Sequence, residues 1–544
     1  MLIFEWVVGV LLGAVLLAAL ARRVGAPYPA FLALGGVALA FVPGVPNLKL
    51  DPELALALFL APVLLDAGYD TSLRDLKANW RPIAGLAFGA VAVTTVAVAV
   101  VAKALVPAMP FPACIVLGAV VAPPDAVAAL SVLRHVSLPH RLSTILRGES
   151  LLNDAGSLLI YRLGVAAAIT GAFNPGEIAP TFLIGVVGSL VAGPVLAIGY
   201  VAVTRRFQDT ASIIVLQFVA AFGIWIAAEG LELSGVLTVV TFAITVARFS
   251  PGITAPRTRI LSYAVWDTAV FVLNVLAFVL IGIQISPILD RLNQGEQVSA
   301  TLLAGMVFLT VVLTRIAWVL PASGIDRLEF TGPRKERQAS RGKDRDGKNR
   351  DAEAAAQAPG LGLRAAVALS WSGMRGIVTI ATALALPPGG PDGGFPYRDL
   401  IVFTAFCTVI GTLVVQGLTL GPLLARLKLK DDDPVGQEVG RARAEAYAAA
   451  LESLDATELE GQEAAATEAL RAEFRAALDE AKSHDEGRAP ESLPSDAVRR
   501  RAIAAARDTV LRLRREGRIG DDAYYVLEEE FDWAELNATP RAET

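Results

Sequence analysis

The chain has 544 residues, of which 54% are hydrophobic, and its mean hydropathy is +0.53. Length alone would suggest several soluble domains, but this composition excludes that class and indicates a membrane protein built from spanning helices. The formal net charge of −5 is informative only through its distribution, because the charged residues are strongly segregated along the chain.

Apolar runs of about 20 residues, the length that crosses a bilayer as a helix, repeat over the first 425 residues. The first run has no basic segment before it and no cleavage site after it, so we expect a retained span rather than a signal peptide. The predicted fold is an all-α polytopic membrane protein with about thirteen transmembrane helices. They are expected at 4–21, 27–43, 52–68, 82–105, 112–133, 147–171, 179–203, 211–230, 233–248, 263–285, 300–320, 362–386 and 400–424.

The loops between these spans alternate in basic content. Loops after odd-numbered spans carry clusters such as Arg22 and Arg23 or Arg205 and Arg206, whereas loops after even-numbered spans hold few cations. The positive-inside rule then places the N-terminus outside and the C-terminus in the cytoplasm. We expect a multi-pass protein of the inner (plasma) membrane, in contact with lipid and without a nucleic-acid partner.

Two segments depart from this pattern. Residues 322–361 are highly charged and lack apolar periodicity, which predicts a disordered cytoplasmic loop within a transmembrane domain of residues 1–429. Residues 430–544 are rich in alanine, glutamate and arginine, which predicts a cytoplasmic helical domain. It is expected to end in a helical hairpin near Gly517–Gly520.

Acidic residues lie in the third and fifth spans. Asp66 lies inside the cytoplasmic end of FLAPVLLDAGYD, and Asp125 follows Pro123 and Pro124 in VVAPPDAVAAL. Each proline removes a backbone donor and its ring clashes with the preceding turn, so a continuous helix is not expected there. Broken helices at membrane depth are tolerated where they line a cavity, and their free carbonyls suit ion binding.

The sixth span carries the densest polar motif, GESLLNDA, with Glu149, Ser150, Asn153 and Asp154. Helical periodicity puts Glu149 and Asn153 on one face and Ser150 and Asp154 on another. A carboxylate near the bilayer centre costs about 2.5–3.5 kcal/mol, so these acids indicate function. The alternative, that Asn153 and Asp154 cap a helix at the membrane surface, fits poorly because apolar sequence continues beyond them.

The twelfth span contains Arg375 between Gly373 and Gly376, another weak point in a helix. A buried arginine needs an acidic partner, and Glu149 is the best candidate, which would leave the aspartates for cations. Spans 4–6 and 11–13 occupy corresponding positions in two halves with inverted topology. Paired interrupted spans indicate a transporter site near the midplane of the bilayer.

Other chemistry is not indicated. Cys114 and Cys407 lie in apolar runs and are expected to be small core residues, and the three histidines offer no metal-ligand spacing. We therefore expect no bound cofactor and no enzymatic activity. An intramembrane aspartyl protease would need a Gly-x-Gly-Asp partner for Tyr69-Asp70, and the sequence has none.

The motifs FLAPVLLDAGY, APPDAVAAL, GESLLNDA, the Trp266–Gln284 span and SGMRG occur in this order. In this combination the chain resembles the monovalent cation/proton antiporters of the NhaP and NHE type, over roughly residues 1–425. The resemblance implies a homodimer in which a dimerisation domain supports a six-helix core with crossed, partly unwound spans 5 and 12. The core would move as an elevator.

The resemblance also implies roles for individual residues. Asp154 would bind the ion and carry the proton, beside Asn153, and Asp125 would complete or support the site. Further oxygens would come from Ser150, from Asp66 and from the carbonyl of Pro124, while Glu149 and Arg375 would form a structural ion pair. An Asn-Asp pair is associated with electroneutral exchange of one cation for one proton.

Two departures affect this comparison. Position 124 is proline where some members have a hydroxyl residue, and position 267 is aspartate where glutamate is common. The sequence does not distinguish Na⁺ from K⁺ or Li⁺, so a K⁺/H⁺ antiporter remains an alternative. A channel or uniporter would use the same acids without obligatory proton exchange, and a cation-sensing receptor would bind without flux.

Overall fold

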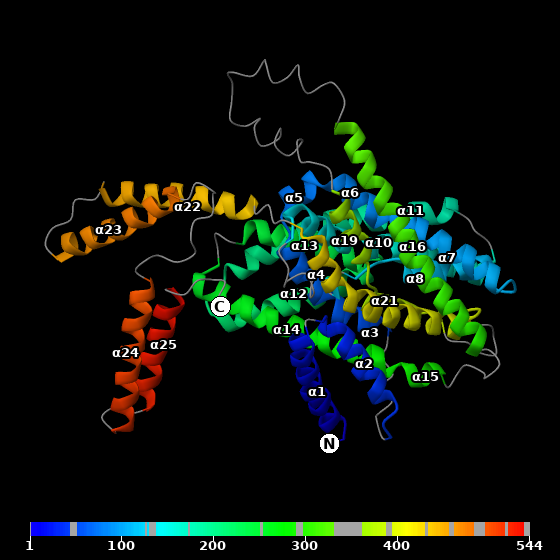
Figure 1. The fold of residues 1–544 in the computed structure, drawn as a ribbon, viewed down its shortest axis with the longest axis horizontal. Helices are drawn as coiled ribbons and strands as arrows, with labels where there is room; N and C mark the ends of the chain where they lie inside the picture. Colours follow the sequence, from blue (N-terminus) through cyan, green and yellow to red (C-terminus); the bar gives the residue numbers. More distant parts are fainter. Residues whose placement is uncertain are drawn as a thin grey trace, which may run out of the picture. The chain divides into compact units, whose positions relative to one another are not determined.

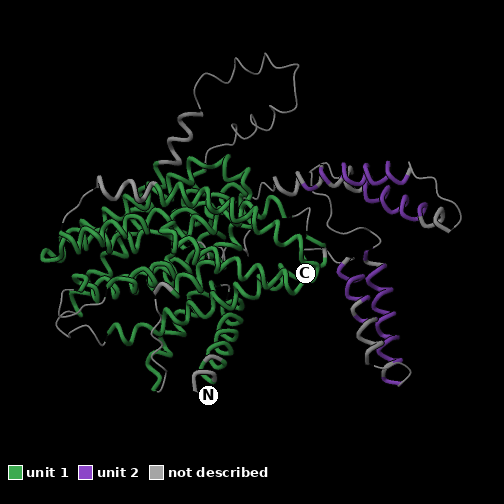
Figure 2. The backbone as a smooth tube through the Cα atoms, turned by 180° about the vertical axis from the view of Figure 1, so that it is seen from behind, with its two compact units in different colours: residues 1–431 green, residues 432–544 purple. Residues whose placement is uncertain are grey.

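The structure of the chain is a computed structural model, and it is helical wherever regular elements occur in its described residues (Figure 1). Two compact units are formed, by residues 1–431 and 432–544 (Figure 2), and the predicted domain boundary after residue 429 lies close to this division. The described residues are 2–24, 26–43, 52–125, 128–129, 138–171, 175–250, 254–289, 297–330, 362–387, 394–429, 434–455, 462–483, 496–516 and 521–537.

The first half of unit 1 follows the predicted spans closely. Two five- or six-residue segments in the third and fourth spans are wound as π-helices, which are rare and often mark functional regions. The elements are α1 (Leu2–Val24), α2 (Tyr28–Ala40), α3 (Pro52–Ala55), η1 (Leu56–Leu60), α4 (Ala61–Tyr69), α5 (Leu73–Ala78), α6 (Trp80–Ala84), η2 (Gly85–Ala90), α7 (Val91–Leu105), α8 (Phe111–Val121) and α10 (His140–Thr170).

The second half of unit 1 also coincides with predicted spans. Six described helices of the chain are long and apolar enough to cross a membrane, and four shorter helices are apolar, so the count of thirteen crossings stays a prediction. The elements are α11 (Pro175–Thr204), α12 (Thr210–Gly230), α13 (Gly235–Phe249), α14 (Pro256–Ile283), α15 (Ile285–Leu289), α16 (Gln297–Phe330), α19 (Leu363–Trp371), α20 (Ile377–Leu384) and α21 (Arg398–Leu427).

Both expected helix breaks are confirmed. Helix α8 ends at Val121, just before the two prolines, and residues 372–376 separate α19 from α20. The two non-helical segments meet, because the backbone N–H of Asp125 donates to the carbonyl of Met374 at 2.6 Å. Each break therefore supplies a backbone partner to the other.

The predicted disordered loop begins too early. Helix α16 continues through Phe330, so residues 322–330 are helical rather than part of a loop. Hydrogen bonding along an established helix is cooperative, and the charged residues that begin there do not stop it. The remainder of that loop, residues 331–361, lies outside the described residues.

Two hydrophobic clusters organise unit 1. The larger cluster joins α7, α8, α16 and α21 with residues of α2 and α14, and the second joins α4, α12 and α13. Cys114 and Cys407 are free thiols, so no disulfide joins them.

Unit 2 consists of two helical hairpins. Helix α22 (Pro434–Asp455) packs on α23 (Gln462–Ser483), where the rings of Tyr447 and Phe474 lie 5.8 Å apart. Helix α24 (Asp496–Arg515) packs on α25 (Asp521–Asn537), and Arg507 pairs with Asp532 and Glu535 at 2.8 and 2.7 Å. The predicted terminal hairpin is therefore confirmed, although residues 517–520 at its turn lie outside the described part.

Helices α2 and α14 cross at two glycines. A methyl group on Gly36 would overlap the carbonyl of Val279 and the backbone of Gly282, so Gly36→Ala is expected to push the helices apart. Overpacking of this kind lowers the free energy of unfolding by about 1–3 kcal/mol. The measurement is thermal unfolding of the purified protein in detergent.

The matched control is Gly223→Ala on α12, where a methyl group would meet no atom within 4 Å. This substitution is expected to leave the unfolding temperature unchanged or slightly higher, because alanine favours helix more than glycine does. Equal unfolding temperatures for both variants would contradict the close crossing of α2 and α14.

Candidate functional site

Helix α10 positions the central motif deep in unit 1. It runs for 31 residues from His140 to Thr170 and ends at Gly171, whose φ of +69° favours glycine. Asp154 lies near its middle, only 6% exposed, and Asn153 is completely buried. The surface-cap alternative is therefore wrong, since the helix continues well beyond Asp154.

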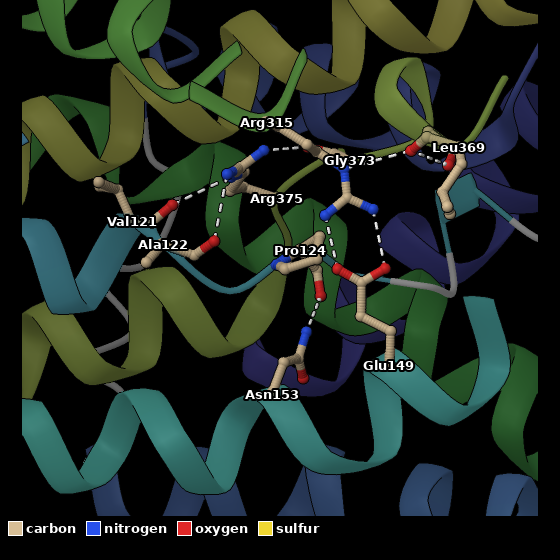
Figure 3. Close-up of polar contacts among 10 residues, drawn as sticks. Val121, Ala122, Pro124, Glu149, Asn153, Arg315, Leu369, Gly373 and Arg375 are labelled. Carbon is tan, nitrogen blue, oxygen red and sulfur yellow. Dashed lines mark hydrogen bonds and ion pairs between the residues drawn. The ribbon is translucent and has the colours of Figure 1, made fainter. Parts of the chain in front are cut away.

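Asn153 connects α10 to the break after α8. Its side-chain Nδ2 donates to the carbonyl of Pro124 at 2.7 Å (Figure 3). Its other side-chain atom, Oδ1, is buried and accepts no hydrogen bond from the described part of the chain. An unmet acceptor of this kind is costly in an apolar interior and indicates a site for a ligand.

Asp125 lies in the break after α8, next to Pro124. Its carboxylate lies close enough to Asp154 to interact electrostatically with it, a proximity that the family resemblance implies. Its carboxyl group also packs against Gly376, where any side chain would overlap it. Glycine at position 376 thus lets the two broken segments approach each other.

Asp154 contacts Ser157 on its own helix through its backbone rather than its side chain. Within the described residues the Asp154 carboxylate accepts no hydrogen bond, while its backbone carbonyl accepts one from Ser157 at 3.0 Å. Ser150, one turn earlier on the same face, is half-buried. The structure therefore brings Asp154, Asn153, Asp125 and the Pro124 carbonyl together, with Ser150 one turn away.

Asp66 is not joined to this group. It lies on α4 and lines a cavity with residues of α11, α12, α13 and α14. No hydrogen bond or ion pair links it to Asp154 in the described part of the structure. A contribution of Asp66 to the ion site stays a prediction.

The predicted ion pair between Glu149 and Arg375 needs correction. Both carboxylate oxygens of Glu149 are engaged by Arg315 of α16, from Nη1 at 2.5 Å and Nη2 at 2.8 Å (Figure 3). The remaining Nε of Arg315 donates to the carbonyl of Leu369 at 3.3 Å. This paired fork engages both oxygens of the carboxylate, and the described part of the structure shows no hydrogen bond between Glu149 and Arg375.

Arg375 instead bonds to the backbone at the helix breaks. Its Nε and Nη2 donate to the carbonyls of Val121 and Ala122 at 3.0 and 3.1 Å, and its Nη1 donates to Gly373. Its backbone N–H donates to Thr412 Oγ1 at 3.0 Å. Arg375 thus satisfies the unmade hydrogen bonds at the C-terminal end of α8, where a positive charge is also favoured.

Sequence reasoning missed Arg315. It lies within an apolar run, LTVVLTRIAWVLP, and that position was the available signal, because a lone arginine inside a predicted span needs a buried partner. It is only 3% exposed.

A double-mutant cycle tests the corrected pairing. Glu149→Gln or Arg315→Met alone is expected to lower the free energy of unfolding by about 3–5 kcal/mol, because each leaves a buried charge without its partner. The double variant is expected to lose less than the sum of the two, with a coupling towards the upper part of the usual range of about 0.5–3 kcal/mol. Unfolding of the purified variants in detergent gives these values.

The comparison cycle combines Glu149→Gln with Arg375→Met. Its coupling is expected to be smaller, because no hydrogen bond joins these two side chains. A larger coupling of Glu149 with Arg375 than with Arg315 would support the predicted Glu149–Arg375 ion pair instead.

Comparisons with known proteins agree on one family. The model of the transmembrane sodium/hydrogen exchanger family matches residues 10–426. The chain is 32% identical over 437 residues to an uncharacterized Na⁺/H⁺ exchanger of Mycobacterium tuberculosis, covering 79% of this chain and 76% of that protein. It is 31% identical over 407 residues to the sodium, potassium, lithium and rubidium/H⁺ antiporter of Bacillus subtilis, covering 72% of this chain and 57% of that protein.

The fold is also shared with a solved structure. The sodium proton antiporter MjNhaP1 from Methanocaldococcus jannaschii at pH 8 superposes with a TM-score of 0.54 at 16% identity. The match covers 78% of this chain and 99% of that one, and at this identity it concerns the fold alone. From the family match and the sequence relatives together, this chain belongs to the transmembrane sodium/hydrogen exchanger family.

Proposed function

We propose that the chain is a secondary active antiporter that exchanges Na⁺, or another alkali cation, for H⁺ at the site formed by Asp154, Asn153 and Asp125. The observation that carries this proposal is the buried Asp154 carboxylate beside an unused Asn153 oxygen, at the point where two broken helices meet. The names of the Mycobacterium and Bacillus relatives support the same exchange, and the latter includes potassium, lithium and rubidium.

The donor atoms fit an alkali cation as cargo. Carboxylate, amide and carbonyl oxygens are hard ligands that hold such ions weakly, which suits an ion that must also leave. Asp154 and Asp125 would supply the charge, and Asn153 Oδ1 a neutral oxygen. The Pro124 carbonyl already accepts the Asn153 amide, and its second lone pair could face an ion.

Exchange follows from competition at Asp154. A bare carboxylate in a buried site is unfavourable, so it binds either a proton or a cation, and each opposes the other. The site loaded with either ion is neutralised and can move, whereas the empty charged site moves reluctantly. The same competition predicts slower cation transport at low pH, because protons then occupy the Asp154 carboxylate.

The proposed movement is an elevator of a core formed by spans 4–6 and 11–13, which contain α7, α8, α10, α16, α19, α20 and α21, against the remaining helices. The Arg315–Glu149 ion pair then lies within the moving core. An apolar contact of small side chains supports it, since Ala55 and Phe59 on one side and Ala277 on α14 pack with Ala381 of α20. We also propose a homodimer in the plasma membrane, with the N-terminus outside and unit 2 in the cytoplasm.

Loss of the central carboxylate tests the exchange itself. In proteoliposomes with an imposed pH gradient, the wild type is expected to dissipate that gradient when Na⁺, Li⁺ or K⁺ is added. Asp154→Asn removes the competing charge while keeping the side-chain size, so exchange is expected to fall at least about a hundredfold. Fluorescence of a trapped pH indicator gives the rate for each cation.

The control is Asp209→Asn, an exposed helix-capping aspartate whose substitution keeps a capping oxygen and is expected to leave the rate unchanged. Near wild-type exchange by folded Asp154→Asn protein would remove Asp154 from the mechanism.

Stoichiometry is tested separately through membrane potential. Exchange of one cation for one proton moves no net charge, so clamping the potential with a potassium ionophore is expected to leave the Na⁺-driven rate unchanged. A rate that follows the imposed potential would indicate electrogenic exchange, and cation flux without proton movement would indicate a channel or uniporter.

A further inference from the structure

A cavity of about 70 Å³ lies outside the proposed cation site, among α4, α11, α12, α13 and α14. None of its lining residues belongs to α8, α10, α19, α20 or α21. It lies where α4, α11 and α13 end and where α12 and α14 begin, which places it at one membrane side. One water needs roughly 10–15 Å³ by this measure, so the cavity has room for about five such groups.

Aromatic side chains form much of its wall. Tyr69 and Tyr263 make an edge-to-face pair with centroids 6.3 Å apart, and Tyr200 and Phe242 make another at 5.5 Å. Trp266 adds a fifth ring to the lining. Five aromatic rings therefore gather around one space, and each ring carries a partly negative face.

The position of Trp266 is fixed by two contacts. One face of its ring stacks on Phe218 at 4.5 Å, and its Nε1 donates to Gln217 Oε1 at 2.6 Å. Gln217 in turn donates to Ser262 at 3.3 Å. The indole is therefore held in place before any ligand arrives, which lowers the entropic cost of binding.

The cavity carries a net negative charge. Asp66 and Asp70 are four residues apart at the end of α4 and so share one face, and both line the cavity. Arg259 of α14 is the one cationic residue of the lining. The lining thus holds two acidic residues and one basic residue, a balance that favours a cation over an anion.

We propose that this cavity binds a small monovalent organic cation of the ammonium class. Aromatic rings attract an ammonium group with apolar substituents, and the five rings of the lining are the feature that favours such a cation. The volume suits a cation of about five heavy atoms, the size of tetramethylammonium. This proposal does not depend on the proposed exchange, because Asp154, Asn153 and Asp125 are not among the residues that line the cavity.

The experiment measures ligand-dependent stabilisation of the purified full-length protein in detergent. Tetramethylammonium chloride is titrated, and sodium chloride is titrated at the same concentrations. Binding to the folded state alone raises the unfolding temperature in a concentration-dependent way. The expected result is a rise that fits a single site, with an apparent affinity weakened at least about fivefold by Asp66→Asn and by Trp266→Leu.

Asp209→Asn is the matched control, because Asp209 lies beside the start of α12 but does not line the cavity. It is expected to keep the wild-type affinity. Asp66→Asn preserves size and shape, so the test stands even if Trp266→Leu fails to fold.

Three results would overturn the assignment. The first is no tetramethylammonium-dependent rise in the wild type. The second is an equal rise in every variant, which would be a general effect of the salt. The third is a sodium-dependent rise that Asp66→Asn abolishes and that displaces tetramethylammonium, which would make the cavity an entry station for the alkali cation.

Discussion

The structure depends on satisfying the backbone where two helices break inside the bilayer. Lipid offers no hydrogen bonds, so each free carbonyl or N–H must find a partner in the protein or in a water-filled cavity. The backbone N–H of Asp125 donates to the carbonyl of Met374. The side chain of Arg375 donates to the carbonyls of Val121, Ala122 and Gly373. These contacts allow the chain to remain unwound next to Asp154, where oxygen atoms can face an ion instead of closing a helix.

The same need for partners determines which charged residues pair near the point where the two broken helices meet. Arg375 is committed to carbonyl groups, so the buried Glu149 needs a different cation, and Arg315 provides it through two hydrogen bonds. Glu149 and Asn153 share one face of α10, which places the ion pair one turn from the amide that contacts Pro124. The ion pair therefore anchors the helix that carries Asp154, and within the described residues neither arginine bonds to Asp154.

Local sequence signals predicted the features that depend on one segment. Prolines at 123 and 124 and glycines at 373 and 376 predicted the breaks, and the meeting of Asp154, Asn153 and Asp125 came from the resemblance to known antiporters. The partner of Glu149 could not be read in this way, because Arg315 lies 166 residues further along the chain. The bonds of Arg375 depend on how the broken ends cross, and the neighbours of Asp66 depend on the packing of five helices. Neither the bonds of Arg375 nor the neighbours of Asp66 can be predicted from one segment of the sequence.

The central claim is that one buried site binds either a cation or a proton, and cation binding with its linked proton release tests it most directly. Calorimetric titration of the purified protein with Na⁺ or Li⁺, in buffers of different ionisation enthalpy, gives the number of protons released per cation. The account predicts release of about one proton per cation where the free site is protonated, and loss of both binding and release in Asp154→Asn. Cation binding without proton release at every pH, or undiminished release in Asp154→Asn, would contradict it.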